Sequence, residues 1–415
     1  MTFEELNLHE NIMKAIRKKG FEKPTPIQKK CIPEIRAGRD VVGQSLTGSG
    51  KTAAFGLPII EKIQPGKGIQ ALILTPTREL ANQVHETIGH FSSFTHVNVT
   101  SVYGGVSIGP QINALRRSEI VVATPGRMLD HIERNTINLK SVKFLVIDEA
   151  DKMFEMGFIE DVEEIIRALP KERQTLLFSA TLPSDVNHLI KRYLKNPIFI
   201  KEQLQVDSSL LKQVYYDVKQ FEKFSLLVHL LKKKTSGLAI VFCGTRREVD
   251  FIAKNLRAQG IHVLPVHGGL SQNKRDNAVD SLKRENIQVL VATDVAARGL
   301  DISNISHIYN YDSPKTSTEY THRIGRTARA GKSGEAVTIL AERDHTNFRN
   351  VMSDRTLNIK REEVPQFERI QTIREEPRHG DRRPRRQFGN NNSYNSHGHS
   401  GGNSHKRRMY SLGGR

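Results

Sequence analysis

Residues 45–52 read SLTGSGKT, and they separate a strand-like run, RDVV at 39–42, from an amphipathic stretch, KTAAFGLPIIEKI at 51–63. A glycine-rich turn between a strand and a helix points successive backbone N–H groups at an anion. Lys51 adds a positive charge, and the hydroxyl of Thr52 can ligate a divalent cation. The stretch therefore predicts a nucleotide-phosphate loop formed by Thr47, Gly48, Ser49, Gly50, Lys51 and Thr52.

Short apolar runs alternate with amphipathic stretches along most of the chain. The apolar runs begin at positions 40, 70, 120, 143 and 174, and again at 238, 262, 287 and 336. This alternation is typical of βαβ units around a parallel sheet. A polar stretch at 201–211 interrupts it. We therefore expect an α/β protein with two tandem parallel-sheet domains, at 1–205 and 206–365, joined by a short linker.

The charge of the chain favours a polyanionic partner. Its formal net charge is +18 over 415 residues, which attracts nucleic acid more readily than a small neutral substrate. Residues 377–415 contain nine Lys or Arg and a single acid, Asp381, with few apolar residues. Such a composition does not form a packed core. We expect a basic, disordered tail at 366–415.

Other protein classes are excluded by what the sequence lacks. No apolar run approaches the ~20 residues of a membrane span, and residues 1–20 lack the pattern of a secretory signal. We therefore expect no membrane association and a cytoplasmic location. Two cysteines, Cys31 and Cys243, cannot build a disulfide framework or a four-thiolate metal site.

Three further segments suggest nucleotide chemistry, each with a plain alternative. KFLVI ends in the acids of DEAD at 148–151, where Asp148 could hold Mg²⁺ and Glu149 could orient or deprotonate water, unless this is a solvated acidic turn. GFEKPTPIQ at 20–28 could bind adenine, or it is a proline-stiffened helix entry. HRIGRTAR at 322–329 spaces three arginines on one face of a helix, for a γ-phosphate, for RNA phosphates or for solvent.

Taken together and in this order, these segments resemble the DEAD-box ATP-dependent RNA helicases, a family of superfamily 2 helicases, over about residues 3–360. The resemblance implies two RecA-like domains, with ATP and Mg²⁺ as cofactors. It also implies an RNA-stimulated ATPase that locally unwinds short duplexes. PTPIQ at 24–28 is similar to the adenine-binding Q motif, so the resemblance assigns adenine to Phe21, Thr25 and Gln28.

The resemblance also assigns the chemistry of ATP hydrolysis. It implies that Asp294 reaches the ribose and that Arg326 and Arg329 face the γ-phosphate, with Arg329 as the arginine finger. The implied catalytic residues are Lys51, Asp148, Glu149, Arg326 and Arg329, and the implied metal ligands are Thr52 and Asp148. Three residues depart from the family pattern. Ser45 replaces a Gly or Ala, and Thr321 stands where a larger apolar residue is common. Ala328 replaces a glycine, where we expect a helix to tolerate the methyl group.

RNA contacts and coupling between the domains are likewise implied by the resemblance. The expected RNA-binding residues are Pro76, Thr77, Arg78, Gly104, Gly105, Thr124, Gly126, Arg127, Gly244, Thr245, Gln272, Arg275, Thr293 and Gly299. Their hydroxyls, backbone N–H groups and guanidinium groups suit the RNA backbone rather than base edges, so binding should not depend on sequence. The expected coupling residues are Ser179, Thr181, Asp151, His322 and Arg323, with Arg323 tied to the acidic loop across the cleft.

The partner is therefore expected to be RNA, single-stranded or in short duplexes, bound by a monomer that could serve in ribosomal or RNA-decay assemblies. One alternative is an ATP-gated RNA clamp or annealing chaperone with little unwinding, which the basic tail would favour. A less favoured alternative is a DNA translocase, which dependence on the 2′-OH group would distinguish.

Overall fold

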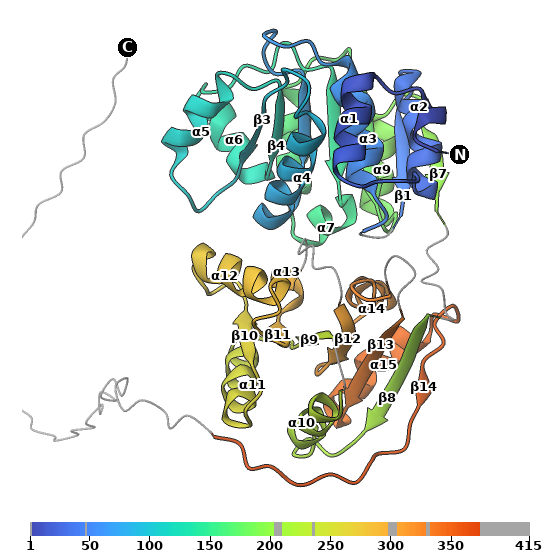
Figure 1. The fold of residues 1–415 in the computed structure, drawn as a ribbon, viewed down its shortest axis with the longest axis vertical. Helices are drawn as coiled ribbons and strands as arrows, with labels where there is room; N and C mark the ends of the chain where they lie inside the picture. Colours follow the sequence, from blue (N-terminus) through green and yellow to red (C-terminus); the bar gives the residue numbers. More distant parts are fainter. Residues whose placement is uncertain are drawn as a thin grey trace, which may run out of the picture. The chain divides into compact units, whose positions relative to one another are not determined.

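The computed structural model describes residues 2–45, 48–202, 210–234, 237–297, 305–328 and 333–373 (Figure 1). Within these ranges the side chains of Gln272, Asp276 and Val295 are not described. The predictions made for Thr47, Gly299, Arg329, most of the linker and the basic tail beyond 373 lie outside the described residues. The side-chain prediction for Gln272 does so as well.

The first half of the chain forms a seven-stranded parallel sheet in the order β3-β4-β2-β5-β6-β1-β7. Its strands are β1 (Val41–Gln44), β2 (Ala71–Leu74), β3 (Val99–Val102), β4 (Ile120–Ala123), β5 (Phe144–Asp148), β6 (Gln174–Ser179) and β7 (Ile198–Lys201). Its helices are η1 (Glu4–Leu6), α1 (Glu10–Lys18), α2 (Pro26–Arg36), α3 (Lys51–Lys62), α4 (Arg78–Phe91), α5 (Ile108–Leu115), α6 (Pro125–Glu133), α7 (Ala150–Glu155), α8 (Ile159–Arg167) and α9 (Ser184–Tyr193).

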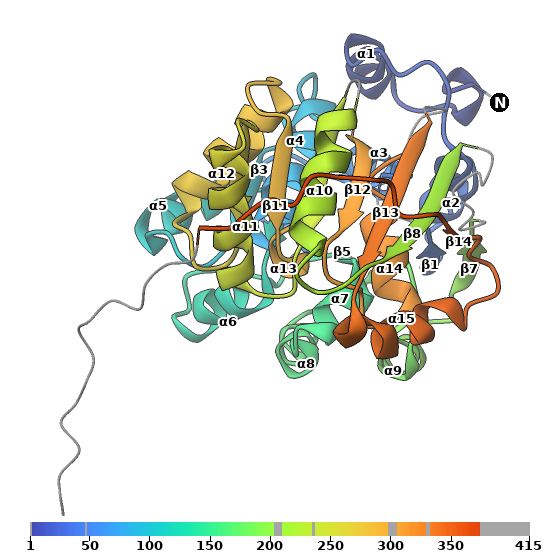
Figure 2. The same ribbon diagram turned by 90° about the horizontal axis from the view of Figure 1, so that it is seen from below.

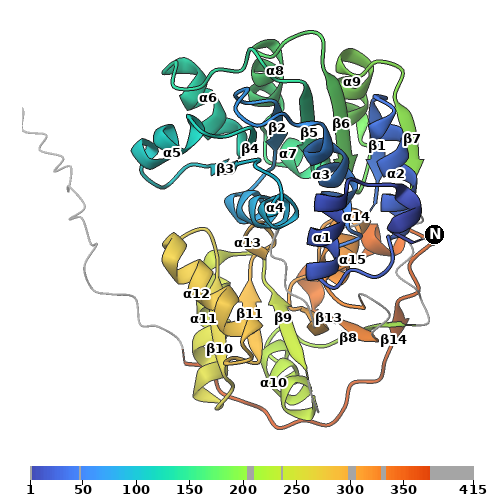
Figure 3. The same ribbon diagram turned by 45° about the horizontal axis from the view of Figure 1, so that its top comes forward.

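The central strands of this sheet are continuous apolar runs because helices cover both faces. Along β2, Ala71 and Ile73 belong to a core shared with α1 to α4, whereas Leu72 and Leu74 belong to a second core shared with α6 to α9. Figure 3 shows α1, α3 and α4 on the same side of the sheet. Alternate residues of each strand therefore bury against opposite helical layers.

The second half repeats this plan with a parallel sheet in the order β10-β11-β9-β12-β13-β8-β14. Its strands are β8 (Leu211–Asp217), β9 (Leu238–Phe242), β10 (Val263–Val266), β11 (Val289–Ala292), β12 (Ile305–Asn310), β13 (Gly334–Leu340) and β14 (Lys360–Arg361). Its helices are α10 (Lys223–Lys233), α11 (Arg246–Ala258), α12 (Gln272–Lys283), α13 (Asp294–Ala297), α14 (Ser317–Ile324), η2 (Glu342–Asp344) and α15 (His345–Met352). The predicted fold class, two tandem RecA-like parallel-sheet domains, is confirmed.

The segment after β14 stays packed against its domain beyond residue 366, where the tail is predicted to begin. The backbone N–H of Ile370 donates to Ser225 Oγ of α10 at 3.0 Å, and the Phe367 ring lies 6.2 Å from the His229 ring. The Arg369 guanidinium stacks over the Phe221 ring at 4.7 Å. Figure 2 shows the segment after β14 running past α10. These residues extend the compact unit to Thr372. The prediction was too early because Phe367 and Ile370 supply apolar contacts that the basic composition of the tail obscures.

In the part of the chain that the structure describes, the helices are all too short or too polar to cross a bilayer.

Candidate active site

The glycine-rich loop joins β1 to α3, as predicted, and its own side chains brace it. Lys51 is 6% exposed and its Nζ donates to the Ser45 carbonyl oxygen at 3.2 Å. The hydroxyl of Ser49 donates to the Ser45 hydroxyl at 2.9 Å. The serine that replaces the usual Gly or Ala at position 45 therefore forms a hydrogen bond to the other end of the loop. Gly48 and Gly50 adopt φ angles of +88° and +92°, which residues with a Cβ rarely tolerate.

The GFEKPTPIQ segment packs against this loop. Pro26 opens α2, so the segment is a helix entry, and the side chain of Gln28 also reaches the loop. Its Oε1 accepts from the Thr25 N–H at 3.0 Å, and its Nε2 donates to the Gly50 carbonyl at 3.1 Å. A Cβ on Gly50 would clash with this amide. Phe21 is 41% exposed, with its ring centroid 5.9 Å from that of Phe91, so part of its ring is open to solvent.

The acidic segment at the carboxyl end of β5 is buried, which rules out a solvated acidic turn. Asp148 and Glu149 are each 2% exposed. Burial raises the pKa of Asp148 to about 6, against the opposing charge of Lys51. Burial alone would also raise the pKa of Glu149, but the charges of Lys152, Lys51 and Arg326 outweigh it and hold that pKa well below its usual value.

Lys152 is a site residue that sequence reasoning missed. Its Nζ lies 2.8 Å from Glu149 Oε2, and both side chains are almost completely buried. Glu149 has a φ of +54°, in the left-handed region, which sets its side chain one helical turn from Lys152 on α7. The spacing of three residues between an acid and a base was the available signal. This pair keeps Glu149 ionised in a buried position.

Asp151 joins the acidic segment to the Ser-Ala-Thr segment after β6. The N–H of Asp151 donates to Ser179 Oγ at 3.1 Å, and the N–H and hydroxyl of Thr181 donate to Asp151 Oδ2 at 2.9 and 3.0 Å. His322 from α14 places Nε2 3.8 Å from the same oxygen. Burial, with the charge of Lys152, lowers the pKa of His322 to about 4 although Asp151 acts in the opposite sense.

The arginine cluster after α14 differs from its prediction. The helix ends at Ile324, because Thr327 forms a β-bridge to Ile305 and donates its hydroxyl to the Ile305 carbonyl at 2.5 Å. Arg323 and Arg326 therefore do not share a helical face, and Arg329 lies outside the described residues. Arg326 sits in the turn, 4% exposed, where its charge acts on Glu149. Ala328 has a φ of +53°, so the expectation of a helical methyl group there is wrong.

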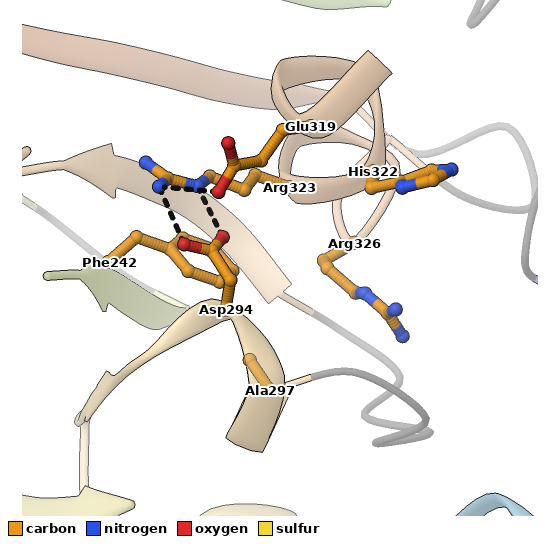
Figure 4. Close-up of a pocket in the computed structure, with 7 residues that line it drawn as sticks. All are labelled: Phe242, Asp294, Ala297, Glu319, His322, Arg323 and Arg326. Atoms are coloured by element: carbon orange, nitrogen blue, oxygen red, sulfur yellow. Dashed lines mark hydrogen bonds and ion pairs between the residues drawn. The ribbon is translucent and has the colours of Figure 1, made fainter. Parts of the chain in front are cut away.

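Arg323 also departs from its predicted partner. Its Nε and Nη2 donate to the two carboxylate oxygens of Asp294 at 2.6 and 2.8 Å (Figure 4). Its Nη1 donates to the Asp312 carbonyl at 2.7 Å. The prediction that Arg323 binds the acidic loop after β5 is wrong, because its guanidinium is committed within the second sheet. His322, one position earlier, faces that loop. A pocket beside this pair is lined by Phe242, Asp294, Ala297, Glu319, His322, Arg323 and Arg326 (Figure 4).

The predicted RNA-facing segments of the first sheet follow the carboxyl ends of β2, β3 and β4, so they share one edge of the sheet. Thr77 caps α4 by accepting from the Leu80 N–H at 3.2 Å. Gly105 has a φ of +81°, and a Cβ there would clash with the Arg78 guanidinium. Arg127 donates to the Val106 carbonyl at 3.0 Å. Pro76 and Gly104 lie in the loops after β2 and β3, Thr124 is the N-cap of α6, and Gly126 lies in the first turn of α6.

The second sheet places its predicted RNA residues in the same way. Gly244 and Thr245 follow β9, Arg275 lies in the first turns of α12 after β10, and Thr293 follows β11. Thr245 caps α11 by accepting from the Glu248 N–H at 3.2 Å, and the Gly244 N–H donates to Asp312 Oδ2 at 2.7 Å. Arg275 forms an ion pair with Glu79 of α4 at 2.7 Å.

Comparison with known proteins identifies the family. Residues 25–189 match the DEAD/DEAH box helicase family, and residues 222–331 match the helicase conserved C-terminal domain. The chain is 47% identical over 354 residues to the DEAD-box ATP-dependent RNA helicase CshA of Bacillus subtilis (strain 168), covering 85% of this chain and 72% of the relative. The chain belongs to the DEAD-box RNA helicases.

Other helicases are similar to this chain over most of its length. The chain is 45% identical over 366 residues to the CshA of Geobacillus kaustophilus, covering 88% of this chain and 78% of that one. Yeast Dbp5 bound to RNA and ADP BeF3 is 32% identical, with a TM-score of 0.79, over 87% of this chain and 95% of that one. Mss116p bound to ssRNA and AMP-PNP is 30% identical, with the same TM-score, over 88% of this chain and 79% of that one.

The helicase is therefore an ATP-dependent enzyme, an RNA-stimulated ATPase that acts on RNA. Its loop geometry suits a nucleotide phosphate, since the backbone turns at two left-handed glycines and Lys51 lies beside them. Asp148 and Thr52 offer carboxylate and hydroxyl oxygens, the donors that Mg²⁺ prefers. The residues present fit both groups.

Proposed function

We propose that the helicase binds the RNA backbone without sequence preference, hydrolyses ATP when groups from both sheets meet, and opens short duplexes locally. The observation that carries the proposal is the convergence of two sheets on one acidic segment. His322 lies 3.8 Å from Asp151, and the charge of Arg326 acts on Glu149. Chemistry divided between two domains makes hydrolysis depend on their closure.

Each residue of the first sheet has a distinct role in this proposal. The loop N–H groups and Lys51 hold the β- and γ-phosphates. Glu149, kept ionised by Lys152, orients the attacking water and accepts its proton. Mg²⁺, when held by Asp148 and Thr52, supplies charge neutralisation at the phosphate oxygens. Gln28 ties adenine recognition to the loop through its bond to Gly50.

The second sheet supplies the arginines. Arg326, and by the family resemblance Arg329, stabilise the charge that spreads over the γ-phosphate oxygens in the transition state. Asp294 is proposed to reach the ribose while Arg323 fixes its carboxylate. Asp151, Ser179, Thr181 and His322 are proposed to transmit the nucleotide state to the RNA-facing loops. Hydrolysis and phosphate release then free the RNA.

The test is ATPase activity measured without nucleic acid, with single-stranded RNA and with DNA of the same sequence, using Lys51→Ala as the inactive reference. Wild type should respond to RNA far more than to DNA. Arg326→Ala should lose at least about 100-fold of the RNA-stimulated rate. Arg192→Ala, which changes an exposed arginine paired with Glu163, is the matched control. An Arg326→Ala enzyme with full RNA stimulation would refute a site shared between the sheets.

An annealing clamp is the second candidate, carried by the nine basic residues at 377–415. Arginine-rich segments bind single strands through charge, and aromatic residues add stacking. Deleting 377–415 should then abolish strand annealing while RNA-stimulated ATPase continues. Unchanged annealing by the truncated enzyme would remove this candidate.

A further inference from the structure

Asp312 lies between β12 and α14, and its backbone and its side chain accept hydrogen bonds from different partners. Its backbone carbonyl accepts from Arg323 Nη1 at 2.7 Å, while its side-chain Oδ2 accepts from the Gly244 N–H at 2.7 Å. Arg323 belongs to the nucleotide side of the domain, and Gly244 belongs to the loop proposed to contact RNA. A single residue therefore links the two sides.

Both of these contacts are held in place by their surroundings. On the nucleotide side, Arg323 is 3% exposed and donates two hydrogen bonds to Asp294. Because Arg323 also donates to the Asp312 carbonyl, a displacement of Arg323 would displace the Asp312 backbone. On the other side, a Cβ added to Gly244 would lie 3.4 Å from Asp312 Oδ2. The loop therefore packs closely against the carboxylate as well as bonding to it.

The other oxygen of Asp312 is anchored by two cations. Arg343 Nη2 lies 2.5 Å from Oδ1, and Lys223 Nζ lies 3.7 Å from it. Lys223 is completely buried and is bonded to Asp344 Oδ2 at 2.7 Å, which fixes it. With Oδ1 anchored in this way, Oδ2 is held toward Gly244, and the carboxylate cannot swing away from the loop.

The same cluster also reaches the far end of the loop. Arg343 bonds Glu248 Oε1 at 2.8 Å, and the Glu248 N–H bonds the Thr245 hydroxyl at 3.2 Å. Arg343 thus spans from Asp312 to the first turn of α11. The buried charges of Lys223, Asp312 and Asp344 add little net stability compared with apolar packing, so a role in fixing the loop accounts for them better than stability does.

We propose that Asp312 is a positioning residue that couples ATP binding to RNA binding within the second RecA-like domain. Arg323 moves with the nucleotide site, Asp312 moves with Arg323, and Gly244 and Thr245 follow through the Oδ2 bond. This inference rests on the proposed function, because it takes Gly244 and Thr245 as RNA contacts. By linkage, the coupling acts equally in both directions.

The test measures the coupling factor, which is the ratio of the Kd of a non-hydrolysable ATP analogue without RNA to its Kd with saturating single-stranded RNA. The full chain is used as wild type, Asp312→Asn, Asp312→Ala and Asp217→Ala. The control changes a carboxylate on β8 of the same sheet, bonded to His345 at 3.0 Å. Asp312→Ala should lower the coupling factor at least about fivefold, since coupling between sites is typically 5- to 150-fold.

The accompanying values separate positioning from a general structural defect. The nucleotide Kd without RNA should stay within about twofold of wild type, because the alanine variant keeps the carbonyl that Arg323 uses. Asp312→Asn retains an acceptor oxygen and should give an intermediate coupling factor. The control should match wild type. A wild-type coupling factor in Asp312→Ala, or an equal loss of nucleotide affinity with and without RNA, would overturn the inference.

If Asp312→Ala does not fold, Arg343→Gln decides, because that side chain is 50% exposed and its removal leaves Oδ1 only the more distant Lys223. It should lower the coupling factor in the same direction, and no change would refute the inference. The coupling factor of the wild-type chain distinguishes a failure of this inference from a failure of the proposed function. A wild-type chain without coupling contradicts the proposed function itself, whereas a coupled wild type with an equally coupled variant contradicts only the role of Asp312.

Discussion

Arg275 of α12 and Glu79 of α4 form a 2.7 Å ion pair in which the two side chains are only 11% and 9% exposed. Arg275 was expected to bind RNA, and Glu79 follows directly after Arg78, another expected RNA contact. The pair therefore joins the proposed RNA-facing segments of the two sheets. Removing one partner of an ion pair this deeply buried is destabilising, because it leaves the other charge buried without a partner.

Breaking this pair should weaken RNA binding in a non-additive way. Arg275→Gln and Glu79→Gln should each raise the RNA Kd, measured by fluorescence anisotropy with a non-hydrolysable ATP analogue present. The double variant should be little worse than the weaker-binding single variant, giving an interaction energy of about 1–3 kcal/mol. Purely additive losses would mean that the two residues act on RNA separately and that the ion pair has no part in binding.

Gln28 should contribute to ATP affinity through the loop. Its amide donates to the Gly50 carbonyl, so Gln28→Ala removes a bond that fixes the phosphate loop. One such hydrogen bond contributes about 0.5–1.5 kcal/mol, which predicts a rise of about 2- to 12-fold in the KM for ATP at saturating RNA. Steady-state ATPase kinetics measure it. Gln259→Ala, at the end of α11, should leave the KM unchanged, and an unchanged KM in Gln28→Ala would contradict this role.

The sequence was sufficient for the fold and for the position of the glycine-rich loop, because local patterns determine both. The apolar runs of β2, β4 and β5 and the glycine loop before Lys51 depend on neighbouring residues, and the structure places them as predicted. Strands with fewer apolar residues, such as β3 and β14, were missed. Their pairing comes from the sheet and not from their own composition.

The partners of Arg323 could not be predicted from the sequence. Asp294, Asn310 and Asp312 are separated from it by 11 to 29 residues, and the topology of the second sheet brings them together. The helix end at Ile324 was missed for a similar reason. The bridge between Thr327 and Ile305 is a tertiary contact that overrides the helical spacing of the arginines.

Replacing Ala328 with glycine should make the folded protein more stable. Its φ of +53° lies in the left-handed region, where a Cβ costs roughly 1–2 kcal/mol. The extra freedom of glycine in the unfolded chain offsets about 0.4–1 kcal/mol of this. Ala328→Gly should therefore raise the melting temperature by about 1–3 °C in calorimetry. Ala278→Gly, within α12, should lower it, and a similar drop in Ala328→Gly would show that the backbone is unstrained there.

Glu248 should make stability depend on pH near neutrality. Burial, together with the adjacent Asp312 carboxylate, raises its pKa from 4.5 to about 7, against the charge of Arg343. A carboxyl whose pKa is higher in the folded chain binds its proton more tightly there. Its favourable contribution is therefore present at low pH, falls as the pH rises from about 4.5 to 7, and is lost above 7.

Replacing Glu248 with glutamine removes this dependence. At pH 5.5 the folded acid is still mostly protonated, like the amide, so the two chains should differ in melting temperature less than they do at pH 8. At pH 8 the wild type holds three carboxylates, Asp312, Asp344 and Glu248, against the cations Lys223 and Arg343. Glu248→Gln should then melt higher by about 2–4 °C, which corresponds to about 1 kcal/mol after allowance for solvent screening. Melting curves from pH 5.5 to 8.5 measure the difference. The exposed Glu342→Gln should show no such trend, and a constant difference for Glu248→Gln would mean that this carboxyl does not titrate in that range.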